Sequence, residues 1–92
     1  MNQVHLLISG RVQGVWFRRF VCQTAVADGL SGWVKNNSDG TVEVMARGEN
    51  KSLTKLMSAC QKGPFFARVD DVCYLPVSDE DLPIEDGIFK KV

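Results

Sequence analysis

The stretch that decides the fold is VHLLISGRVQGVWFRRFVCQTAVADG, residues 4–29. Apolar residues alternate with others at its beginning, which predicts a strand over residues 4–9. Apolar residues then recur at spacings of three and four, which predicts a helix over about residues 17–28 that ends at Gly29. A strand that runs through a short loop into a helix is the first half of a strand–helix–strand unit.

The rest of the chain supplies the partner elements of this unit. The apolar patterns and turn signals predict strands over residues 30–36 and 41–47, joined by a turn at Asp39-Gly40. A helix is expected over about residues 51–62, with Asn50 as a possible N-cap and Gly63-Pro64 as its end. A strand over about residues 67–75 and a short last strand in GIFKKV, residues 87–92, complete the chain. The order βαββαβ predicts an α+β ferredoxin-like sandwich. We expect one domain over residues 1–92, with two helices on one face of a mostly antiparallel sheet of four to five strands.

Composition narrows the class of function. Lys and Arg total 11, as do Asp and Glu, so the net charge is zero, which argues against bulk binding of nucleic acid. No stretch is long and apolar enough to span a membrane, and the N-terminus lacks the layout of a secretion signal. We therefore expect a cytoplasmic protein, and from its size a monomer. An acidic run near the C-terminus, which we expect to be a solvated loop, contains Asp79, Glu80, Asp81, Glu85 and Asp86.

The metal-ligating residue types are few and scattered. The chain has three cysteines, Cys22, Cys60 and Cys73, and its only histidine is His5. A structural zinc site needs about four such ligands at close spacings, so no metal site is expected. We expect the cysteines to be buried free thiols and His5 to be a strand residue without a catalytic role.

The loop GRVQGVWFRR, residues 10–19, places Arg18 and Arg19 at the start of a helix. A helix N-terminus carries roughly half a positive charge, so cations are locally unfavourable there. A bound anion would resolve the conflict, because it would accept from the free N–H groups and pair with a guanidinium, while Gly14 lets the backbone curl around it. The alternative is a glycine turn followed by two solvated arginines, and the spacing alone leaves both possibilities open.

Three blocks together resemble the acylphosphatase family. GRVQGVWFRR, GLSGWVKNNSDGTVEV (residues 29–44) and GPFFARVDDV (residues 63–72) follow the order and separation of that family's GxVQGVxFR, GxxGxVxN and GPxxAxVxxV motifs. The resemblance covers about residues 4–76. It implies hydrolysis of acyl phosphates to a carboxylate and inorganic phosphate, without metal or cofactor. Inorganic phosphate or sulfate would then act as an inhibitor.

The resemblance also implies which residues do the work. The phosphate would be held by the loop of Gln13, Gly14, Val15, Trp16, Phe17 and Arg18. Arg18 would bind the phosphate oxygens and Asn36 would hold the attacking water. Arg19 is expected to be a solvated neighbour, because consecutive helical residues point about 100° apart. Asn37, which stands where the family usually has Thr, is expected on the opposite side of the strand from Asn36.

The residues suit this chemistry. A carboxylate leaving group needs little protonation, so the lack of an evident acid–base pair is no obstacle. Phosphoryl transfer depends mainly on positioning and charge stabilisation, which the loop amides, Arg18 and Asn36 could supply. Trp16 is expected to flank the entrance to the site. At least one of Phe65 and Phe66 is expected to pack into the protein.

Two other functions remain as alternatives. The first is a non-catalytic module that binds phosphate or carbamoyl phosphate; similar domains occur at the N-terminus of a larger, multidomain hydrogenase-maturation protein. The length of 92 residues favours a free-standing enzyme over this module. The second is an RNA-binding module, which would need aromatic residues on the central strands for base stacking. The strands predicted over residues 4–9 and 41–47 contain no Phe, Tyr or Trp.

Overall fold

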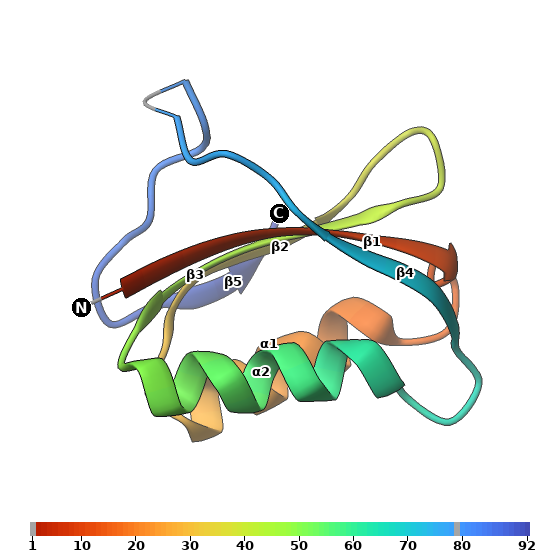
Figure 1. Ribbon diagram of the computed structural model, residues 1–92, viewed down its shortest axis with the longest axis horizontal. Coiled ribbons are helices and arrows are strands. Elements are labelled where there is room, and N and C mark those ends of the chain that lie inside the picture. The colour runs from red at the N-terminus through yellow and green to blue at the C-terminus, as the bar shows by residue number, and fades with distance from the viewer. Residues whose placement is uncertain (1, 79) are drawn as a thin grey trace.

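A five-stranded sheet carries two helices on one face in the computed structural model, which describes residues 2–78 and 80–92 (Figure 1). Along the chain the elements are β1 (Asn2–Arg11), α1 (Phe17–Ala27), β2 (Ser31–Asn36), β3 (Val42–Gly48), α2 (Asn50–Lys62), β4 (Arg68–Tyr74) and β5 (Phe89–Lys91). Across the sheet the order is β4-β1-β3-β2-β5. The predicted ferredoxin-like sandwich is confirmed, with a fifth strand at its edge.

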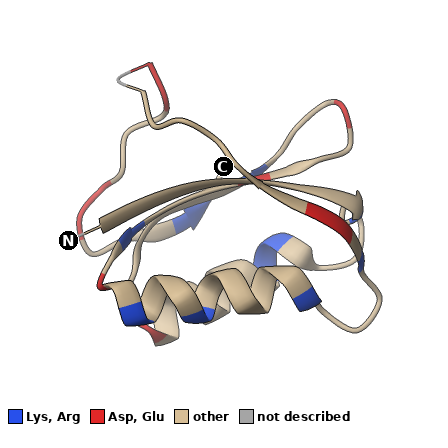
Figure 2. Ribbon diagram, viewed as in Figure 1, with Lys and Arg blue, Asp and Glu red and all other residues tan. Residues whose placement is uncertain are grey.

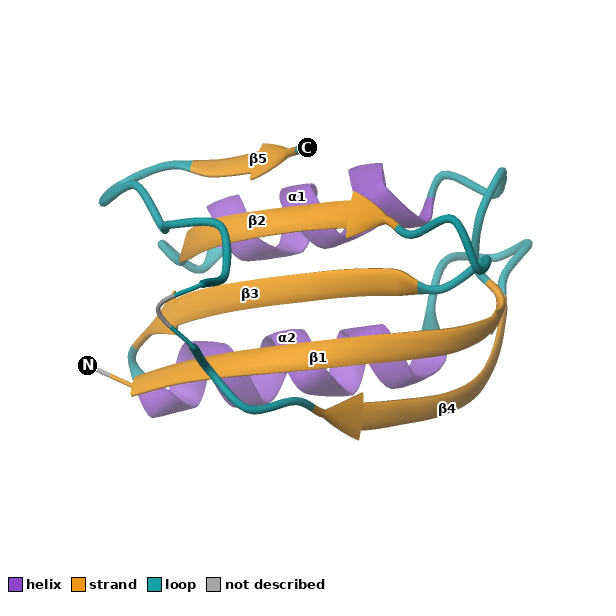
Figure 3. Cartoon of the chain, turned by 90° about the horizontal axis from the view of Figure 1, so that it is seen from above, coloured by secondary structure: helices purple, strands orange, loops and turns teal. Residues whose placement is uncertain are grey.

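Strand pairing is mostly antiparallel, as predicted. β1 pairs antiparallel with β3 and with β4, and β2 pairs antiparallel with β3. β5 pairs in parallel with β2, opposite Gly32 to Val34, and so brings the end of the described chain beside α1 (Figure 3). This last pairing later decides which residues reach the candidate site.

The core lies between the sheet and the helices. Each helix turns one apolar stripe inward, and the strands present alternate residues to it. The fully buried side chains include Leu6, Ile8, Val34, Val42 and Val44 from the strands, Phe17, Val21 and Ala25 from α1, and Leu56 and Cys60 from α2. Burial at these positions follows the periodicity of the sequence.

The opposite face of the sheet is also partly covered. Residues 75–78 and 80–88 cross over it between β4 and β5 (Figure 3). Under them His5, Trp33 and Met45 are buried, and the Trp33 indole N–H donates to the Leu82 carbonyl oxygen at 2.9 Å. The expectation of a solvated acidic loop is wrong for Asp81, which lies 3.6 Å from His5 Nδ1, whereas Asp79 lies outside the described residues.

The ends of the helices mostly follow the predicted signals. Gly29 and Gly63 both have φ of 70° and stand just past α1 and α2, as expected of helix stops. The prediction of Asn50 as N-cap is wrong, because Glu49 occupies that position and Asn50 is the first helical residue. The Asn50 side chain instead accepts a hydrogen bond from Asn2, across the gap to β1.

Two predictions about apolar side chains are also wrong. Phe65 and Phe66 are 93% and 66% exposed, because they project from the turn between α2 and β4. Their rings lie edge to face, with the centroids 5.0 Å apart. Of the cysteines only Cys60 is buried; Cys22 is half-buried, and Cys73 is exposed on the edge strand β4. None of the helices described here is long and apolar enough to cross a membrane.

Candidate active site

An open pocket of about 310 Å³ lies at the N-terminal end of α1. The loop between β1 and α1, the first turn of α1, the end of β2 and β5 all contribute to its wall. Its lining residues are Val12, Gly14, Trp16, Phe17, Arg18, Arg19, Asn36 and Lys91.

The loop is curled by two residues in the left-handed region. Gly14 has φ of 74° and Trp16 has φ of 65°, which is uncommon for a residue with a Cβ atom. Within the described chain, the N–H groups of residues 13–16 donate to no protein acceptor. The first turn of α1 adds further N–H groups that have no intrahelical partner. Such a run of free donors at a helix N-terminus is suited to an anion.

The side chains around the pocket are cationic. Arg18 is half-buried, and its Nη1 lies 3.5 Å from the Val92 carbonyl oxygen. Arg19 is exposed, and Lys91 belongs to β5. Figure 2 shows the blue of Lys and Arg on both β5 and α1. Among the residues that the structure describes, these three cations form no ion pair and no carboxylate lines the pocket. The charged side chains at the pocket are therefore all positive, although the whole chain is neutral.

The pKa of Cys22, one turn further along α1, is affected by the cations at the pocket. Burial raises the pKa of its thiol above the ordinary value, while the charges of Lys91 and Arg18 act in the opposite direction. Lys91 and Arg18 therefore both lie near enough to favour a negative charge beside the pocket.

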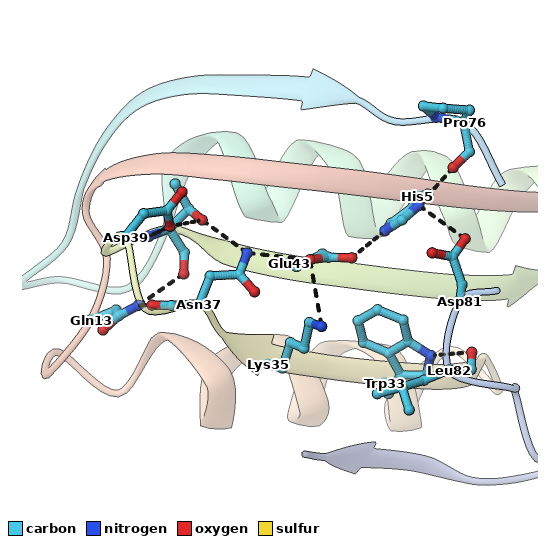
Figure 4. Close-up of polar contacts among 11 residues, drawn as sticks. His5, Gln13, Trp33, Lys35, Asn37, Asp39, Glu43, Pro76, Asp81 and Leu82 are labelled. Atoms are coloured by element: carbon cyan, nitrogen blue, oxygen red, sulfur yellow. Dashed lines mark hydrogen bonds and ion pairs between the residues drawn. The ribbon is translucent and has the colours of Figure 1, made fainter. Parts of the chain in front are cut away.

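The structure separates the two neighbouring asparagines. Asn36, at the end of β2, lines the pocket and is exposed. The side chain of Asn37 points to the opposite face, where its Nδ2 donates to Thr41 Oγ1 at 3.0 Å and to Glu43 Oε1 at 3.2 Å (Figure 4). The alternation of a strand thus leaves Asn36 free to meet a ligand and engages Asn37 in the fold.

Gln13 connects the β1–α1 loop to the turn between β2 and β3. Its Nε2 donates to the carbonyl oxygens of Asn37 at 2.8 Å and Thr41 at 2.9 Å (Figure 4). These bonds join the loop to the strand end that carries Asn36.

The pocket brings together most, but not all, of the predicted site. Of the predicted phosphate-binding residues Gly14, Trp16, Phe17 and Arg18 line it, and so does Asn36. The Gln13 side chain is turned to the β2–β3 turn, and Val15 is buried in the core. Only the main-chain N–H groups of these two residues are available to a ligand in the pocket.

Three lining residues were missed from the sequence. Arg19 was expected to stay outside the pocket, but side chains of a first helical turn fan outward around the helix end and both arginines reach the wall. Val12 precedes the predicted loop. Lys91 enters through the pairing of β5 with β2, for which the local sequence has no signal.

The only histidine lies outside the pocket. On the outer face of the sheet, His5 Nε2 is 2.5 Å from Glu43 Oε2, and Nδ1 is 2.9 Å from the Pro76 carbonyl oxygen and 3.6 Å from Asp81 (Figure 4). Lys35 Nζ lies 3.8 Å from the other Glu43 oxygen. This network is paired within itself, as expected of a structural histidine.

Fold and pocket together define a class: a ferredoxin-like α+β protein with a cationic pocket and free N–H groups at its first strand–loop–helix unit. The acylphosphatase family model matches residues 4–87. The chain is 45% identical over 83 residues to an acylphosphatase of Rhodospirillum rubrum, which covers 90% of this chain and 91% of the relative. It is 45% identical over 82 residues to one of Methylococcus capsulatus, over 87% of this chain and 89% of that relative.

Solved structures agree with the sequence relatives. The acylphosphatase of Bacillus subtilis superposes with a TM-score of 0.87 at 38% identity and covers 100% of this chain and 99% of its own. A full-length HypF in a phosphate- and nucleotide-bound form superposes with a TM-score of 0.76 at 31% identity, but only over 12% of its chain. The protein described here belongs to the acylphosphatase family.

Proposed function

We propose that this protein hydrolyses the carboxyl–phosphate bond of acyl phosphates to a carboxylate and inorganic phosphate. The observation that carries the proposal is the meeting of free loop N–H groups, Arg18 and Asn36 in one pocket without a carboxylate. Membership of the acylphosphatase family supports the same reaction.

The phosphate group binds first. Its oxygens accept from the N–H groups of the loop that runs from Gln13 to Arg18, and Arg18 presents its guanidinium fork to two of them. These donors are held in place before the substrate arrives, so they stabilise the charge of the transition state with little reorganisation.

The water attacks from the side of Asn36. The amide oxygen of Asn36 can accept a hydrogen bond from the water, and its NH2 group can donate to a phosphate oxygen. Asn36 orients the water without acting as a strong base. The water oxygen bonds to phosphorus while the bond from phosphorus to the acyl oxygen breaks in line with the attack, the carboxylate leaves with the electron pair of that bond, and the proton of the water passes to a phosphate oxygen. The described lining residues include no imidazole or carboxylate, the groups that usually hold catalytic Zn²⁺ or Mg²⁺, and we therefore propose a metal-independent reaction.

The second candidate is a module that binds phosphate or carbamoyl phosphate without turnover. The likeness to one segment of HypF is the observation that favours it. Both candidates would bind phosphate through the loop N–H groups and Arg18, but only the enzyme needs Asn36 exposed at the pocket wall.

The test is hydrolysis of benzoyl phosphate by the purified protein in the presence of a metal chelator. We expect turnover that is insensitive to chelator and competitively inhibited by inorganic phosphate or sulfate. Tight phosphate binding without turnover would support the binding module instead. Activity that chelator removes and a divalent metal restores would contradict the metal-independent reaction.

We also propose that the protein acts as a monomer in the cytoplasm. The cysteines are all free, which suits a reducing compartment, and the size of the domain is ordinary for a monomer. Sedimentation of the active protein tests the first point, and fractionation of its source cell tests the second.

A further inference from the structure

Trp16 is a large aromatic side chain that the fold leaves uncovered on the wall of the pocket. It is 70% exposed, although burial of an indole is strongly favourable. Phe65 and Phe66 are exposed as well, but they do not line the pocket. The position of Trp16, rather than its exposure alone, therefore calls for a reason.

The backbone of Trp16 is held in an unfavourable conformation. Its φ of 65° lies in the left-handed region, which glycine or asparagine adopts more readily than a residue with a bulky side chain. Strain of this kind persists where the surroundings impose it, and it is concentrated at ligand sites. The conformation of the turn does not require a tryptophan at this position.

A neighbouring cation favours one orientation of the indole. The Arg19 guanidinium carbon lies 5.7 Å from the centroid of the Trp16 ring, within the range of a cation–π contact. An aromatic side chain that is oriented in advance loses less conformational freedom when a ligand binds.

The pocket has room for more than a phosphate. Its volume of about 310 Å³ is near the lower end of sites for small organic ligands, which span roughly 300–1,000 Å³. The loop N–H groups and Arg18 serve the phosphate end, and the Trp16 side chain is the exposed apolar surface that remains.

We propose that the Trp16 indole is the acyl-side subsite, which favours substrates whose acyl group is aromatic or otherwise flat and apolar. The proposal rests on the proposed hydrolysis of acyl phosphates and names the part of the substrate that the phosphate loop does not read. The acyl group lies against the indole, while the loop and Arg18 hold the phosphate.

The experiment compares kcat/KM for benzoyl phosphate and acetyl phosphate in the wild type, Trp16→Asn and Trp16→Phe. Asparagine tolerates the left-handed backbone and removes the ring, whereas phenylalanine keeps a ring. From the usual strength of contacts between aromatic rings, we expect the benzoyl-to-acetyl ratio of kcat/KM to fall roughly three- to tenfold in Trp16→Asn. In Trp16→Phe the ratio should stay within about twofold of the wild type. Phe65→Asn, which removes an exposed ring outside the pocket, should keep the wild-type ratio.

A benzoyl-to-acetyl ratio that stays unchanged in Trp16→Asn would overturn the proposal. If both kcat/KM values also stay unchanged, the indole has no part in substrate recognition. If both fall by the same factor, the side chain acts only through the loop or the phosphate.

Binding separates this proposal from the proposed function. Calorimetric titration with benzylphosphonate and methylphosphonate, which are not hydrolysed in this way, measures the aromatic preference without turnover. If the wild type hydrolyses neither acyl phosphate but prefers benzylphosphonate through Trp16, the proposed reaction fails and the subsite stands. If it hydrolyses both and Trp16→Asn leaves the phosphonate preference intact, the subsite fails and the reaction stands.

Discussion

Arg18 stands half-buried in the first turn of α1 and lines the pocket together with the exposed Arg19. In Arg18→Gln we expect KM to rise and kcat/KM to fall by about 10³-fold or more, because a guanidinium on a transferring phosphoryl group is worth that much. Arg19→Gln is the matched control, since it removes the same charge from the adjacent position. Steady-state kinetics with benzoyl phosphate check both variants, and a larger loss in Arg19→Gln would reverse the assignment.

Asn36 and Asn37 offer a second matched pair. In Asn36→Ala we expect kcat to fall on the order of 100-fold while the inhibition constant of inorganic phosphate stays nearly constant, because the side chain acts on the water. Asn37→Ala removes the bonds to Thr41 and Glu43 instead and should mainly lower stability. If turnover depends more on Asn37 than on Asn36, the proposed role of Asn36 is wrong.

At the scale of elements, the β1–α1 loop and the β2–β3 turn are joined through Gln13. Gln13→Met keeps the side-chain length and removes both donated hydrogen bonds. Each carbonyl retains another partner, since Asn37 O accepts from Gly40 and Thr41 O accepts from Asn37. We therefore expect the free energy of unfolding to fall by only about 1–2 kcal/mol.

Turnover should respond to the same change. With the link removed, the strand end that carries Asn36 is less firmly placed against the phosphate, and kcat should fall more than phosphate affinity. Denaturant unfolding and kinetics measure the two effects. Gln61→Met, an equivalent change at an exposed position of α2, is the control and should alter neither.

At the scale of the whole molecule, the three thiols differ in reactivity because the fold buries them to different extents. Burial raises the pKa of Cys60 to about 12, while Cys73 is exposed and has its pKa raised mainly by a hydrogen bond to Asp71. Since thiolates are the reactive form, a thiol reagent at pH 8 should label Cys73 first, Cys22 more slowly and Cys60 only on unfolding. Mass spectrometry of timed samples checks the order, and rapid labelling of Cys60 in the folded protein would contradict the core.

The same thiol links stability to alkaline pH. Cys60 ionises near its ordinary pKa of 9.0 in the unfolded chain but only near about 12 in the fold. Above pH 9 the unfolded state therefore binds fewer protons, and stability falls as pH rises toward 12. Cys60→Ala should be less stable than the wild type at neutral pH, because it leaves a cavity, but should lack this part of the slope, which denaturant unfolding between about pH 8 and pH 11 measures.

Much of the fold was readable from the sequence because its signals are local. The stripe of Phe17, Val21 and Ala25, the helix stops Gly29 and Gly63 and the alternation along β3 depend only on the spacing of neighbouring residues. The N-cap prediction was wrong because Asn50, a residue type that is favoured at N-caps, lies one position inside the helix. Phe65, Phe66 and Cys73 misled because their burial depends on whether another segment covers them, and none of the described ones does.

The sequence by itself determined the order of the elements and predicted that Arg18 and Asn36 meet at the loop between β1 and α1. Only the tertiary structure placed Lys91 at the pocket, covered His5 and Trp33 on the outer face of the sheet and showed the exposed indole of Trp16 at the pocket wall. The reason is physical. Helical and strand periodicity is set by a few adjacent residues, whereas the parallel pairing of β5 and the path of the residues before it depend on contacts between segments far apart in the chain.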